Sequence, residues 1–141
     1  MDARQAIERN LNTLLGADAT LLSLATGGVF IDPVPPGAAR PMVVVAVQAP
    51  QADTYTLRKR IEEVTDYQVK AITDGESKVV GQTIAARIDA ILNDATPTLE
   101  AGWIVLNIRR VRAVDYAEVP TATDQPIRHQ GGIYRFEVTQ P

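Results

Sequence analysis

Cysteine is absent from this chain of 141 residues, and histidine and tryptophan each occur once. The lack of cysteine excludes disulfide frameworks, thiolate zinc sites and cysteine nucleophiles, and it fits a reducing compartment. No apolar run approaches the roughly 20 residues that a membrane-spanning helix needs. The N-terminus reads as the start of an amphipathic helix and not as a signal peptide. We therefore expect a soluble protein.

Strong positive charge is also missing. The formal net charge is −3, which argues against a dedicated binder of duplex nucleic acid, because such proteins carry a basic face. Hydrophobic residues make up 45% of the chain and charged residues 22%, so it can bury a core. The length fits one domain over residues 1–141, and we find no linker or internal repeat.

No set of residues announces catalysis. His129 lies in a polar, glycine-flanked segment without a neighbouring Asp or Cys pattern, so we interpret it as a solvated loop histidine. The carboxylates, Asp66 among them, are scattered along the chain, and no glycine cluster forms a phosphate loop. We expect no enzymatic activity, no cofactor and no metal site.

Three segments have helical patterns. Residues 2–15 place Ile7, Leu11 and Leu15 on one stripe, and Asp18 then caps a second, short helix. Residues 73–76 read Thr-Asp-Gly-Glu, the spacing of a capping box, and apolar residues follow at intervals of three and four as far as Leu92. A helix is therefore predicted over about residues 77–92.

The remaining segments alternate or are continuously apolar, which favours strands at residues 29–31, 42–48, 62–73, 103–114 and 133–139. In the fourth, Ile104, Leu106 and Ile108 are expected on one face. Extended loops are expected at about residues 49–60 and 116–132. The order of elements predicts an α+β fold, a mostly antiparallel β-sheet with two main α-helices packed on one face.

Residues 42–47 have no polar position, so this strand should be covered on both faces. The helices can cover one face. For the other, we expect a neighbouring subunit or a curled part of the same sheet. The proline-rich residues 32–41 precede this strand and should form a stiff, exposed loop.

Two basic clusters stand out, one at residues 58–60 and one formed by Arg109, Arg110 and Arg112. They indicate either contact with an acidic partner or solvated strand ends. Our candidates for interface residues are Pro35, Pro36, Arg40, Arg58, Arg60, Arg110, Arg112, Tyr116 and Arg128.

The order of these features resembles the tail terminator and tail-completion proteins of long-tailed bacteriophages. The likeness is carried by the helix with Leu11 and Leu15, the segment Gly-Val-Phe-Ile-Asp-Pro-Val-Pro-Pro-Gly-Ala-Ala-Arg-Pro before the apolar strand, the helix over residues 77–92 and the closing Tyr-Arg-Phe-Glu-Val. Together these cover nearly the whole chain.

The resemblance implies a structural virion protein and not an enzyme. Its relatives form a ring, usually of six subunits, which caps the tail tube, ends tube polymerisation and joins the head-completion or connector protein. By analogy the ring would lie at the head-proximal end of the phage tail, be assembled in the host cytoplasm, and let DNA pass without specific binding. The segments 53–60 and 116–132 are then candidates for intersubunit and axial contacts.

Two other functions remain open from the residues. A tail-tube or head-completion connector subunit is favoured by the unusual length of the strand around residues 57–73. A small-ligand binder or enzyme on an α+β sheet would need converging polar groups, which the sequence does not offer.

Overall fold

The computed structural model describes residues 1–50, 53–55, 60–75, 77–121 and 125–140. Its helices are α1 (Ala3–Gly16), α2 (Ala19–Leu24) and α3 (Val79–Leu92), with a 3-10 turn η1 at Glu100–Gly102. Its strands are β1 (Val29–Ile31), β2 (Met42–Pro50), β3 (Thr54–Tyr55), β4 (Arg60–Asp74), β5 (Ile104–Glu118) and β6 (Ile127–Thr139).

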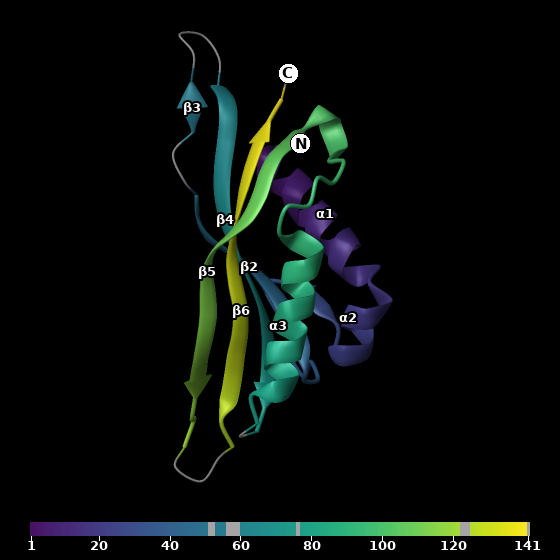
Figure 1. Ribbon diagram of the computed structural model, residues 1–141, viewed down its shortest axis with the longest axis vertical. Coiled ribbons are helices and arrows are strands. Elements are labelled where there is room, and N and C mark those ends of the chain that lie inside the picture. Colours follow the sequence, from purple (N-terminus) through teal and green to yellow (C-terminus); the bar gives the residue numbers. More distant parts are fainter. Residues whose placement is uncertain (51–52, 56–59, 76, 122–124, 141) are drawn as a thin grey trace.

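The sheet has the order β1-β2-β4-β6-β5, and β3 pairs with the start of β4. Only the short β1 runs parallel to its neighbour; the pairs β2–β4, β3–β4, β4–β6 and β5–β6 are antiparallel. All the helices lie on one face of this sheet (Figure 1). The predicted α+β class, with the main helices on one face of a mostly antiparallel sheet, is confirmed.

The first two helices begin where the sequence predicts. Asp2 accepts a hydrogen bond from the backbone of Gln5 at 2.8 Å, and Gln5 Oε1 accepts one from the backbone of Asp2 at 3.2 Å. Asp18 caps α2 by accepting from Leu21 N–H at 2.7 Å. Arg87 Nε also donates to Asp18, at 3.0 Å, so this cap ties α3 to α2. Such N-caps typically contribute about 1 kcal/mol each.

The main core fills the space between the helices and the sheet. Tyr67 of β4 and Phe136 of β6 meet edge to face, with ring centroids 5.4 Å apart, and both are fully buried. Gly81 lets α3 come close to β6, because a Cβ there would collide with the amide of Gln130. The apolar helix residues that close this core are Ile7, Leu11, Leu15, Leu21, Ile84, Ile88 and Leu92.

The predicted capping box at the start of the third helix is wrong. Thr73 and Asp74 belong to the end of β4 and do not cap a helix; α3 starts at Val79 after Lys78, which makes no side-chain cap. Glu76 lies outside the described residues. The antiparallel partner strand decides this boundary, because Thr73 pairs with Arg128 of β6.

The expectation of an extended loop over residues 116–132 is also wrong. Tyr116 and Arg128 lie inside β5 and β6, which pair as far as Glu118 and Ile127. The polar composition of these residues hides strand structure, because much of β5 is exposed. The connection at residues 49–60 is likewise shorter than expected, since β2 continues to Pro50 and β3 intervenes.

The apolar strand β2 obtains cover on both faces from its own chain. Val43 and Val45 face the main core, whereas Met42 and Val44 form a second cluster with Ile72. Phe30, Val34, Ala38 and Ile127 pack against this second cluster. The proline-rich loop therefore folds back over the sheet. The expectation that a neighbouring subunit covers this part of the strand is wrong, although Val47, near its end, is exposed.

This cover can be tested by truncating one side chain beneath it. Val44→Ala should lower the free energy of unfolding by about 2 kcal/mol, because it removes buried methyl groups and leaves a cavity. Val47→Ala, on the same strand, should change it by less than about 0.5 kcal/mol. Urea unfolding at low protein concentration measures both. Equal values for the two variants would contradict the loop's role as cover.

Candidate interaction surfaces

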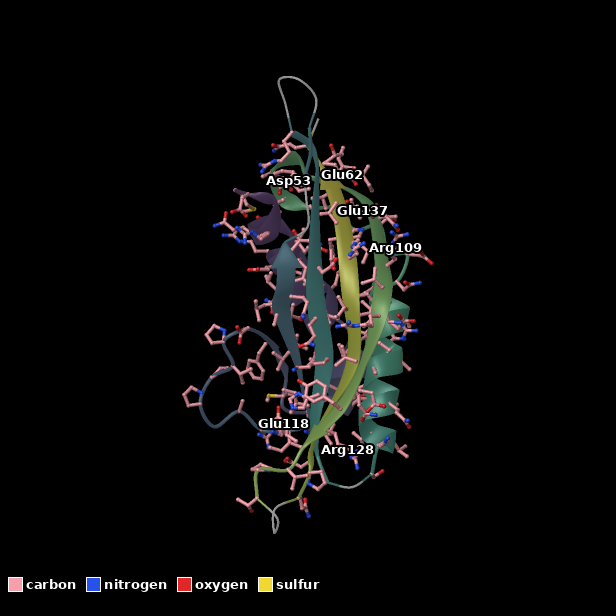
Figure 2. All side chains as sticks on the ribbon, turned by 90° about the vertical axis from the view of Figure 1, so that its left-hand side faces the viewer. Asp53, Glu62, Arg109, Glu118, Arg128 and Glu137 are labelled. Atoms are coloured by element: carbon pink, nitrogen blue, oxygen red, sulfur yellow. The ribbon has the colours of Figure 1, made fainter. Side chains whose placement is uncertain are left out.

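The face of the sheet opposite the helices carries paired charges. Arg135 of β6 holds Asp66 of β4 through two hydrogen bonds of 2.9 and 3.0 Å, and Asp66 is buried. Arg109 and Glu137 lie beside each other on β5 and β6 (Figure 2), with Nη2 and Oε1 3.7 Å apart. Most of these charges are therefore neutralised within the subunit.

His129 lies on the same face and is buried, so its interpretation as a solvated loop histidine is wrong. Its ring stacks on Tyr116 with centroids 4.4 Å apart. Lys70 Nζ donates to the Tyr116 hydroxyl at 2.8 Å. His129 Nε2 lies 3.2 Å from Glu118 Oε1, yet neither ring nitrogen makes a hydrogen bond of good geometry to any residue that the structure describes.

This environment disfavours a charged imidazole. Burial lowers the pKa of His129 below its ordinary value of 6.5; the charges of Lys70 and Arg40 act in the same direction, and Glu118 opposes them. His129 is therefore a neutral packing residue at neutral pH. Its neighbours lie on β4, on β5 and in the proline-rich loop, so it has a structural role on the face of the sheet opposite the helices.

The candidate interface residues do not form one site. Arg40 bonds to Asp74 at 2.7 Å and Arg128 donates to the Gly75 carbonyl at 3.1 Å, so both stabilise the end of the sheet near the β5–β6 connection. Arg60, at the opposite end, pairs with Asp53 at 3.3 Å and with Glu63. Pro35 and Pro36 are exposed on the loop beside β1. Arg58 lies outside the described residues.

Strand β5 forms a long edge of the sheet with little cover. Of its 15 residues only Ile108 and Val114 are buried, whereas no residue of β6 is fully exposed. Register shifts between Val105 and Asn107 and between Arg110 and Arg112 disturb the alternation. The predicted common face of Ile104, Leu106 and Ile108 is wrong for this reason: the first two are exposed.

The second irregularity separates the arginines. Arg110 points toward α3, where its Nε lies 3.9 Å from Asp89 Oδ1. Arg112 pairs in register with Ile133 and is exposed, and among the described residues it makes no ion pair. Val111, the extra residue between them, is 40% exposed. The sequence marks this position only by an apolar residue within a basic run.

A shallow groove of about 510 Å³ lies at the other edge of the sheet, between α1 and β1. Its apolar lining comes from Val29, Phe30, Ile31, Pro33 and Pro35. On the α1 side it is lined by Glu8, Arg9 and Asn12. Sequence reasoning identified the prolines here but not the groove, because α1 and β1 meet only in the folded chain.

No group of three or more His, Asp or Glu residues in the described ranges can hold a metal ion. None of the helices that the structure describes has the length and apolar character of a membrane span.

A family model described as tail completion protein gp17 matches residues 9–126, which is most of the chain. This chain belongs to that phage tail completion family. A comparison with curated protein sequences finds no match. As a member of the family it is a structural protein of the phage tail, located in the virion.

Two solved structures are similar to this chain. One, from the virion of a native gene transfer agent particle, has 25% sequence identity and a TM-score of 0.67, with 90% of each chain covered. A second shares 19% identity, with a TM-score of 0.58 over 98% of this chain and 94% of the other, and supports the fold alone.

The burial of His129 predicts that the stability of this tail completion protein depends on pH. Because its pKa is lower in the folded state than in the unfolded chain, the unfolded state takes up the proton first. Stability should therefore be full above about pH 6.5 and decrease as pH falls through the folded pKa. His129→Phe keeps a ring against Tyr116 and should flatten this decrease.

Urea unfolding of both proteins between about pH 8 and about pH 5.5 makes the comparison. The difference in unfolding free energy between them should change across this interval, with the wild type losing more at the acid end. Parallel profiles would show that His129 titrates equally in both states.

Proposed function

We propose that this protein forms a closed ring, of six subunits by analogy with the tail terminators it resembles, which caps the tail tube and ends its polymerisation. The family match over residues 9–126 carries this proposal. The uncovered edge strand β5 supports it, because a subunit with a bare edge and a groove at its opposite edge is suited to head-to-tail association.

The two ends of the subunit offer surfaces for different partners. The β3–β4 pairing lies at one end of the sheet and the β5–β6 connection at the other (Figure 1). In a ring with its axis along the strands, one end would contact the tail tube protein and the other the head-completion or connector protein. The net charge of −3 suits a channel through which DNA passes without specific binding.

A second candidate function is that of a tail-tube or connector subunit. The 15-residue β4, whose start pairs with β3 and not with β2, favours it, because tube proteins reach along the tube with such extensions. An enzymatic role has less support, because the described ionisable groups with shifted pKa values lie in separate parts of the subunit. Asp18 is held in an ion pair with Arg87, His129 is packed against Tyr116, and Glu63, which lines a small cleft, pairs with Arg60.

Negative-stain electron microscopy and light scattering of the purified protein, alone and with tail tubes, separate these functions. We expect closed rings with a mass of about six chains, bound at one end of each tube, because a closed ring leaves no free interface for growth. Open tubes of this protein alone would favour the tube-subunit function. A monomer that never joins a tube would contradict both.

A further inference from the structure

We propose that neighbouring copies associate through Val111 and Arg112 of β5 on one copy and the groove beside β1 on the next, with Arg112 pairing with Asp32. This inference rests on the proposed ring and identifies its subunit interface. In this interface, the β1 groove of one copy is occupied by the β5 edge of a second copy of this chain.

The two edges are complementary in shape and polarity, because one has an apolar groove and the other an exposed apolar side chain. The β1 edge has an open groove with an apolar lining that includes Phe30, Ile31 and Pro33. The β5 edge presents Val111, an exposed valine lifted out of the register by the bulge. A small apolar side chain facing an apolar groove of another copy makes a heterologous contact, which closes into a ring when the rotation permits.

Charge supports the same pairing. Asp32 follows β1 directly and is exposed, and among the described residues it makes no ion pair. Arg112 of β5 likewise makes no ion pair among the described residues. The other two arginines of this cluster have acidic neighbours, since Arg109 lies near Glu137 and Arg110 lies near Asp89. An unpaired negative charge therefore stands at the β1 edge, and an unpaired positive charge stands at the β5 edge.

The register of the sheet places these charges at the same height. Asp32 N–H donates to the Val45 carbonyl at 2.8 Å. The next residue of β2, Ala46, lies opposite Gln68 of β4. Gln68 lies opposite Ile133 of β6, and Ile133 lies opposite Arg112 of β5. Rotation about an axis parallel to the strands leaves heights unchanged, so Arg112 of one copy meets Asp32 of the next.

Side chains, and not a continued backbone ladder, make this contact. The bulges of β5 interrupt the regular row of edge N–H and C=O groups that strand addition requires. At the other edge, β1 is only 3 residues long and cannot template a strand of 15.

Charge reversal tests the pair in the full chain. Arg112→Glu and Asp32→Arg should each reduce the fraction of protein in rings at least about tenfold, because each places like charges together. The double variant, with both reversals, should recover most of the ring fraction. Lys78→Glu changes an exposed cation outside both edges and should assemble as the wild type does. Circular dichroism confirms that each variant is folded.

Cross-linking gives a second readout that does not depend on the reversals. The natural chain has no cysteine, so a variant with Arg112→Cys and Asp32→Cys carries the only two thiols. Within one subunit they are separated by four strand spacings, roughly 19 Å, too far for a disulfide. Mild oxidation should therefore yield a ladder of linked subunits, which a Lys78→Cys and Asp32→Cys variant should not.

The outcomes distinguish this interface from the ring itself. Wild-type rings that tolerate both reversals and give no ladder would overturn the interface and leave the proposed function standing. A wild type that never forms rings, with or without tail tubes, would overturn both. Loss in the single variants, recovery in the double and a specific ladder would establish it.

Discussion

The antiparallel pairing of β4 with β6 is the constraint on which the rest of the structure depends. It runs without a register shift from Glu63 opposite Val138 to Asp74 opposite Ile127. One face of the pair presents Tyr67 and Phe136 to the helices, and the other presents residues that carry charge or pack under the proline-rich loop. Because the alternation is strict here, a slip of one residue would exchange the two faces, so the core fixes the register.

The strands on the two sides of this central pair are covered to different extents. On one side β2 and β1 are covered by the helices and by the loop that returns over Met42 and Val44. On the other side β5 remains largely exposed, because α3 packs mainly against β6 and β4. An exposed strand of 15 residues is an aggregation hazard that proteins reduce with bulges and charges. Both devices are present in β5, and they leave Val111 and Arg112 available for a specific partner.

The helices and the central strands were predictable because their patterns are strong. Asp2 and Asp18 mark the helix starts, and the apolar stripes and the alternation around Phe136 follow simple periods. The end of β5 at Tyr116 was not predictable, because this strand is exposed to solvent and has no apolar alternation. The start of β6 at Arg128 was missed because its residues are polar, although they pair with β4 and are covered. The sequence predicted only part of the candidate surface. Arg112 and Pro35 were among the predicted interface residues, whereas Asp32 and Val111 were not, because the bulge and the groove that expose them form only in the folded chain.

The sequence by itself determined the class of fold, the absence of cysteine chemistry and the likeness to a phage tail family, because composition and periodicity are local properties. Only the tertiary structure decided what covers the apolar strand, that His129 is buried, and which edge of the sheet remains open. Those features depend on which distant segments lie side by side. Long-range pairing sets that arrangement, and no short stretch of sequence records it.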